Sequence, residues 1–208
     1  MSKRHVRAML RKIASGERVR ITKRTGSVRS LARLAFVAEQ FGYAYADAGL
    51  GGFKSAELVL ELVPDPRPEA QARATRNRAS YPNAGDGVSL PPPVAEEIAL
   101  LEARISFDLA SQFTPKQRVA LGVPLMTALA AAPCIRFGVH STVALVAGLL
   151  WAVFMACVPI GLAHTRRKRA RYAAVLEAAG LTPVTDMLGR LRYVSPGDRR
   201  PVLGNPSA

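Results

Sequence analysis

The sequence predicts an α+β membrane protein, a two-helix transmembrane hairpin with small cytoplasmic α/β segments at both ends. Three observations lead to this fold class. Residues 119–163 are almost entirely apolar and carry a single full charge, Arg136. The segments on either side alternate between the periodicities of helices and strands. Clusters of Lys and Arg flank the apolar stretch.

The apolar stretch is long enough for two membrane spans, at about 119–137 and 141–163. At about 1.5 Å of rise per residue, its apolar runs Val119 to Ile135 and Ser141 to Ala163 give helices of roughly 25 and 34 Å. A hydrocarbon core is about 30 Å thick. The second span is therefore the stronger prediction.

The charges around the spans predict their orientation. Lys116 and Arg118 precede the first span, whereas the connection between the spans offers Arg136 alone. The positive-inside rule then places both termini in the cytoplasm of a multi-pass inner-membrane protein. The residues that set this topology follow the second span and are Arg166, Arg167, Lys168, Arg169 and Arg171.

Outside the spans the chain divides into small pieces. We expect a basic cytoplasmic α+β domain at 1–65, a polar helix and Pro/Gly linker at 66–93, an amphipathic helix at 94–115, the transmembrane hairpin at 116–165, and a basic cytoplasmic helix with a β-hairpin and tail at 166–208. Pieces of this size do not bury a sufficient core alone. The two terminal pieces are therefore expected to pack on each other.

The first domain is predicted as α-β-α-β-β. Its first helix carries an apolar stripe made of Val6, Met9, Leu10 and Ile13. Alternation predicts a strand over 16–24, and one apolar helical face predicts a helix over 28–41. Strands over 43–46 and 56–63 follow, joined by the glycine-rich turn 47–53. A phosphate-binding loop is excluded there because strands flank the glycines on both sides.

The last piece repeats a similar order. A helix continues from the basic cluster and ends at Gly180. Residues 183–185 and 190–194 then predict a β-hairpin around 186–189.

The N-terminus is strongly basic. Of the net charge of +14, residues 1–33 carry eleven Lys or Arg against one acid, Glu17, a local balance of +10. Such a field favours anionic lipid headgroups, nucleic acid or an acidic protein partner. The candidate contact residues are Lys3, Arg4, Arg7, Arg11, Lys12, Arg18, Arg20, Lys23 and Arg24.

The amphipathic N-terminal helix has three interpretations. It can lie on anionic lipid, or touch a phosphate backbone. Alternatively, its apolar stripe packs into the local domain and leaves a solvated basic face.

Small residues recur every fourth position along the second span, at Ala144, Gly148, Ala152 and Ala156. This small-xxx-small pattern lets helix backbones approach closely. We expect a helix-packing seam whose partner is either the first span or the second span of another protomer, in a homo-oligomer.

No catalytic, cofactor or metal motif is present. His5, His140 and His164 lie at separate places, and the sequence contains neither HExxH nor CxxC. Cys134 and Cys157 fall at opposite ends of an antiparallel hairpin and are expected to be free thiols. We therefore expect no enzymatic activity and no cofactor.

The Ala- and Arg-rich composition with few Lys, together with the motif-poor two-span plan, resembles small membrane proteins of high-GC actinobacteria. Some of those are encoded on conjugative plasmids and implicated in plasmid spread. The resemblance is in composition and in the two-span plan of the whole chain, and it assigns no role to any residue.

These observations favour a non-catalytic, membrane-anchored interaction or scaffold protein that binds a partner at the inner leaflet. The alternative is a membrane-tethered nucleic-acid-binding protein that assists plasmid transfer or spread. Against the alternative, the basic arm has no aromatic residue before Phe36 to stack on a base.

Overall fold

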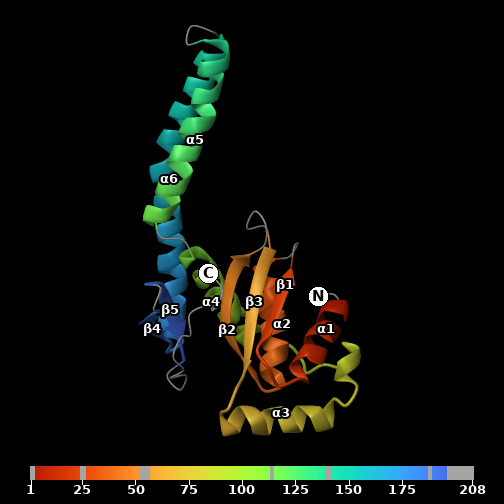
Figure 1. Ribbon diagram of the computed structural model, residues 1–208. Helices are drawn as coiled ribbons and strands as arrows, with labels where there is room; N and C mark the ends of the chain where they lie inside the picture. The colour runs from red at the N-terminus through yellow and green to blue at the C-terminus, as the bar shows by residue number, and fades with distance from the viewer. Residues whose placement is uncertain are drawn as a thin grey trace. The chain divides into compact units, whose positions relative to one another are not determined.

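The computed structural model describes residues 3–23, 27–51, 57–112, 115–138, 142–186 and 189–195. Over these residues the protein is a mixed α and β structure with two long apolar helices (Figure 1). The chain forms two compact units, of which one combines Met1–Gln112 with Tyr172–Ala208 and the other is Phe113–Arg171. The first unit is thus discontinuous in sequence, and the second is inserted into it.

A three-stranded antiparallel sheet lies in the first unit, with strand order β1-β3-β2. Its strands are β1 (Val19–Lys23), β2 (Tyr43–Gly51) and β3 (Glu57–Pro64). The predicted alternation in β3 is confirmed. Leu60 and Leu62 are buried, whereas Glu61 lies opposite Arg20 of β1 on the other face.

Strand β2 is longer than the sequence predicts. The prediction of a turn from Asp47 onward is wrong, because Asp47–Gly51 continue β2 and pair with β3 after a bulge between Tyr45 and Asp47. The glycines serve close packing within the sheet instead. A Cβ on Gly51 would lie 2.8 Å from Cγ2 of Val59. Residues 52 and 53 of the predicted turn lie outside the described residues.

Helices α1 (Lys3–Ile13), α2 (Val28–Gln40) and α4 (Ala95–Ser111) supply the rest of the core. The predicted stripe of α1 is confirmed, since Val6, Met9 and Ile13 are buried and Leu10 packs against the core. Ser27 caps the first turn of α2, because the Ser30 N–H donates to Ser27 Oγ at 3.3 Å. The apolar stripe of α4 packs mainly against α2 and β2.

Helix α3 (Pro68–Ser80) lacks a large apolar face and is held mostly by polar contacts. Arg73, Asn77 and Arg78 donate hydrogen bonds to the carbonyl oxygens of residues 39, 40 and 41. The last carbonyls of a helix have no partner within the helix. Helix α3 therefore caps the C-terminal end of α2, while its own Ala70 and Ala74 are buried.

The segment predicted as a linker packs on α1. It contains a short 3-10 helix, η2 (Ala84–Asp86), in which Ala84 is buried. Arg7 Nε donates to the carbonyl of Asp86 at 2.7 Å. Gly87 has φ of +66°, and a Cβ there would lie 3.0 Å from the Lys3 carbonyl oxygen, so this close approach requires glycine.

The C-terminal piece joins the first unit, as its small size predicts. The β-hairpin of β4 (Thr182–Thr185) and β5 (Leu191–Val194) is confirmed. Leu176, near the end of α6 (Thr142–Ala178), is fully buried in one cluster with Phe107 and Tyr193. The Phe107 and Tyr193 rings meet edge to face with centroids 4.9 Å apart.

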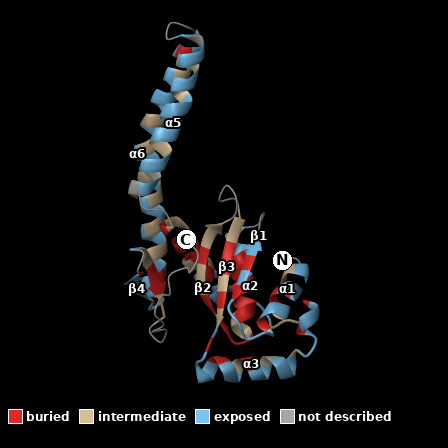
Figure 2. Cartoon of the chain, in the orientation of Figure 1, coloured by how far each residue is buried: buried red, intermediate tan, exposed pale blue. Residues whose placement is uncertain are grey.

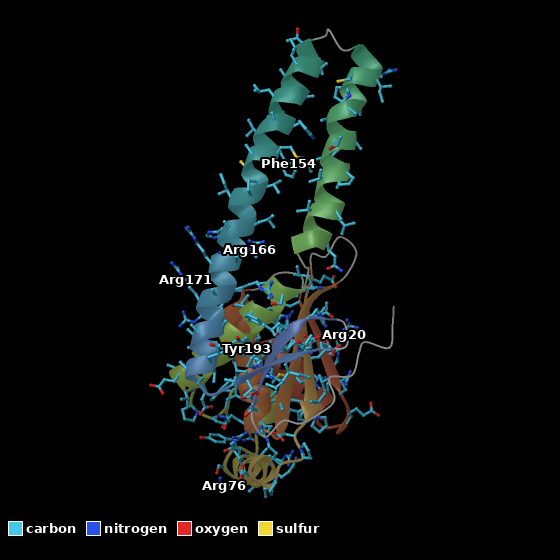
Figure 3. All side chains as sticks on the ribbon, turned by 90° about the vertical axis from the view of Figure 1, so that its left-hand side faces the viewer. Arg20, Arg76, Phe154, Arg166, Arg171 and Tyr193 are labelled. Carbon is cyan, nitrogen blue, oxygen red and sulfur yellow. The ribbon has the colours of Figure 1, made fainter. Side chains whose placement is uncertain are left out.

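The second unit consists of α5 (Pro115–Phe137) and the longer part of α6, which lie side by side in both views (Figures 1 and 3). Mean hydropathy is 1.6 over Val119–Arg136 and 2.5 in the most apolar stretch of α6. Both helices are long and apolar enough to span a membrane. Helix α6 runs without a break through the basic cluster at 166–171.

Candidate functional site

The predicted basic residues lie on the surface of the first unit. The exposed members are Lys3, Arg4, Arg7, Arg11, Lys12, Arg18 and Arg20. Lys23 is half-buried, and Arg24 lies outside the described residues. The structure therefore places these cations where an external anion can reach them.

Several of these cations already have partners within the unit. Arg18 and Arg20 both approach Glu61, at 3.9 and 3.7 Å. Lys12 Nζ donates to a carbonyl of β1, and Lys23 Nζ donates to Ser30 Oγ. Within the part of the chain that the structure describes, Lys3, Arg4 and Arg11 have no hydrogen bond or ion pair. They are the cations most available to a ligand.

The apolar stripe of α1 bears on the lipid hypothesis. A surface-bound amphipathic helix inserts its apolar face into the headgroup boundary. In α1 that face is occupied by the protein core, with Val6 1% and Met9 0% exposed. An anionic lipid surface can therefore contact α1 only through the charged side chains of the helix.

A groove of about 640 Å³ adjoins α1. Its walls come from α1, from the connection between α2 and β2, from α3 and from residues 81–85. Arg11 and Arg78 line it together with Phe41, Tyr43 and Tyr81. The basic arm has no aromatic residue of its own before Phe36, but the fold brings aromatic rings from later segments beside Arg11.

A buried cluster of charges joins the C-terminal hairpin to the rest of the first unit. Arg192 of β5 lies 2.9 Å from Asp47 and 3.7 Å from Asp108 of α4. It also donates a hydrogen bond to the carbonyl of Ala46, at the bulge of β2. Arg190 lies 3.6 Å from Asp47. Two cations that follow the apolar helices in sequence thus meet two carboxylates that precede them.

Tyr45 extends this cluster into the core. Its hydroxyl donates to Oδ2 of Asp108 at 2.6 Å, and the guanidinium of Arg104 lies 4.8 Å from the centre of its ring. Burial raises the pKa of Tyr45 well above its ordinary value, and the charge of Asp108 adds to the effect. The phenol therefore remains a hydrogen-bond donor at any physiological pH.

Two carboxyl groups in this region are harder to ionise than usual. Burial raises the pKa of Asp108, although the charge of Arg192 opposes the shift. Burial likewise raises the pKa of Glu39 to about 7, against the opposing charges of Arg104 and Arg73. Arg192 favours the carboxylate form of Asp108, as do the Tyr45 hydroxyl and the charge of Arg104.

The small residues of α6 lie mostly on an open surface of the second unit. Ala144 is buried, whereas Gly148, Ala152 and Ala156 are exposed. A Cβ added at Gly148 would meet nothing within 4 Å. Contact with α5 involves Trp151, whose Nε1 donates to Thr127 Oγ1 at 3.1 Å. The seam therefore remains available to a second protomer, and its use there stays a hypothesis.

The residues expected to set the topology follow the apolar part of α6. Arg166, Arg167, Lys168 and Arg171 are exposed and Arg169 is half-buried. In Figure 3, Phe154 marks the apolar part of this helix, and Arg166 and Arg171 come after it toward the C-terminal end.

Within the described ranges, no group of three or more His, Cys, Asp or Glu side chains is arranged to hold a metal ion. Cys134 and Cys157 are free thiols, as expected. His140 and the end of the tail lie outside the described residues.

Comparison with protein-family models, with curated proteins and with solved structures found no match for the chain. The assignment of function therefore depends on the physical features of the chain itself.

Replacing Arg192 with Gln will destabilise the first unit by about 3 kcal/mol. Removing one partner of a buried ion pair leaves the other charge buried without a counter-charge. Arg20→Gln is the matched control, since its ion pair with Glu61 is more exposed and such pairs contribute at most about 1 kcal/mol. Denaturant unfolding of the full chain in detergent, followed by circular dichroism, measures both. Equal effects of the two substitutions would contradict a special role for Arg192.

If the seam packs between protomers, Gly148→Leu will lower self-association by about tenfold, equivalent to about 1.4 kcal/mol, because the larger side chain keeps the backbones apart. Crosslinking in membranes measures the dimer. Gly161→Leu is the control, since Gly161 is equally open but lies off the strip. Unchanged crosslinking in Gly148→Leu would remove the hypothesis.

Proposed function

We propose that the chain is an integral inner-membrane protein that crosses the bilayer twice and acts as a membrane-anchored interaction or scaffold protein. The observation that carries the proposal is the exposure of large apolar side chains along α5 and α6 (Figure 2). Leu121 and Leu149 are each 67% exposed, whereas Leu34 and Leu60 of the first unit are fully buried. One chain thus contains a surface suited to water and another suited to lipid.

The cost of leaving these helices in water supports this proposal. Each Å² of apolar surface in contact with water raises the free energy by about 25 cal/mol relative to an apolar environment. A contiguous apolar patch above a few hundred Å² is rare on soluble monomers. The exposed residues of α5 and α6 follow one another along both helices, so lipid is the environment that removes the cost.

The discontinuous first unit supports a topology with both termini on one side. Residues before α5 and after α6 fold into the same unit, joined by Arg192 with Asp47 and Asp108. Both ends of the inserted hairpin must then emerge on the same face of the bilayer. The basic residues 166–171 favour the cytoplasmic face, by the positive-inside rule.

The interaction role follows from the surface of the first unit. Its free cations Lys3, Arg4 and Arg11 suit an acidic protein partner or the anionic lipids of the inner leaflet. No residue of the unit is given a catalytic role in this proposal. Anchoring confines the domain to the membrane surface, where a partner is captured close to the bilayer.

A membrane-tethered nucleic-acid binder is the second candidate, for example one that assists plasmid transfer or spread. One observation favours it. Because the apolar face of α1 is buried, the helix can bind only through charge, and a phosphate backbone needs nothing more.

Labelling of introduced cysteines tests the membrane proposal. In a background with Cys134→Ala and Cys157→Ala, an impermeant maleimide should label Gly138→Cys in intact cells, and Ser80→Cys only after lysis. The protein should also resist extraction by alkaline carbonate, because its apolar helices prefer lipid. Labelling of Ser80→Cys in intact cells, or carbonate extraction, would refute the assigned topology.

Salt dependence separates the two candidates. If duplex DNA is the ligand, its affinity for the full chain in zwitterionic detergent should fall with a log–log slope of about −3 or steeper, as expected when three cations displace counterions. The double variant Lys3→Gln, Arg4→Gln should reduce that slope by about 2. The pair Arg166→Gln, Arg167→Gln carries the same charge change and serves as control. A flat salt profile would exclude the nucleic-acid candidate.

A further inference from the structure

The groove beside α1 is suited to a small ligand. Ligand pockets usually measure about 300–1,000 Å³, are lined mainly by apolar and aromatic groups, and contain a few polar groups that orient the ligand. The groove has a volume of about 640 Å³, and its apolar walls include Leu10, Ile13 and Pro64. It lies wholly within the first unit.

Its charge is of one sign. Among the described residues that line it, the charged side chains are Arg11 and Arg78, with no Asp or Glu. Arg11 makes no hydrogen bond or ion pair with any described residue. Arg78 donates from Nη2 to the Phe41 carbonyl at 3.2 Å, which leaves its other guanidinium nitrogens for a ligand. The planar guanidinium fork matches the oxygens of a phosphate.

The aromatic groups of the groove differ in availability. The hydroxyl of Tyr43 is engaged with the carbonyls of Ile13 and Glu17, at 2.9 and 3.1 Å. Tyr81 is half-buried, and its hydroxyl makes no hydrogen bond to the described residues. Its side chain is therefore only partly covered, and it lines the groove together with the two arginines.

We propose that this groove binds a nucleotide, with the base against Tyr81 and the phosphate paired with Arg11 and Arg78. A planar base and a phosphate are the two chemical parts that an aromatic ring and guanidinium groups with open donor positions recognise together. The ligand can be a free nucleotide or one nucleotide of a single strand. This site goes beyond the membrane-anchored role and does not rest on it.

The test uses the full chain in detergent, titrated by calorimetry with ADP and, separately, with an oligothymidylate single strand. Arg11→Gln and Tyr81→Leu are the test variants, and leucine keeps the apolar packing at position 81. Each should weaken binding by about fivefold or more, the lower end of a base-stacking or charged contact. Tighter binding of ADP assigns the site to free nucleotides, whereas tighter binding of the oligonucleotide assigns it to single strands.

Arg76→Gln is the matched control, because Arg76 lies on the same helix as Arg78, is exposed and does not line the groove. It should change affinity by less than about twofold, as expected for an exposed charge. Circular dichroism checks that each variant is folded. Equal weakening by Arg76→Gln and Arg11→Gln, no effect of Tyr81→Leu, or no binding of either probe at about 1 mM would overturn the proposal. Membrane extraction and cysteine labelling are separate readouts, so failure here leaves the anchored role intact.

Discussion

The contact between Arg192 and the two carboxylates of Asp47 and Asp108 joins the two parts of the first unit that lie before and after the apolar helices. It links β5, near the end of the described chain, to β2 and α4. Burial raises the pKa of Asp108, and the charge of Arg192 opposes this shift. Next to these residues in sequence, the rings of Phe107 and Tyr193 pack edge to face. Charge pairing and ring packing thus both attach the hairpin to α4.

The same unit uses polar contacts wherever its apolar surface is small. Helix α3 has little apolar area, yet its side chains hold the last carbonyls of α2. Gln112 bonds to both the N–H and the carbonyl of Leu50 on the edge of β2. A small domain thus gains order by satisfying backbone groups that secondary structure leaves open.

Periodicity in the sequence predicted most individual elements. The stripe of α1, the alternation of β3 and the β4–β5 hairpin all follow from residue spacing, which local backbone geometry imposes. Glycine misled the prediction at Asp47–Gly51, because it marks close packing as well as turns. The helical character and apolarity of α5 and α6 were equally readable, while their insertion in a bilayer stays a proposal.

The candidate sites could be predicted less well from the sequence, because their residues come together only in the folded chain. Arg11 and Tyr81 share a groove but lie on separate segments, and no spacing rule connects them. Arg192 looked like an ordinary strand residue, although it is nearly buried between two acids. The excess of basic residues at the N-terminus was visible in the sequence, but which of them were already paired was not.

The discontinuity of the first unit has a consequence for synthesis. The ribosome makes β2 and α4 before both apolar helices, and β5 after them. Until β5 emerges, Asp47 and Asp108 have no Arg192 to meet. The first unit is therefore completed only after both apolar helices have been synthesised.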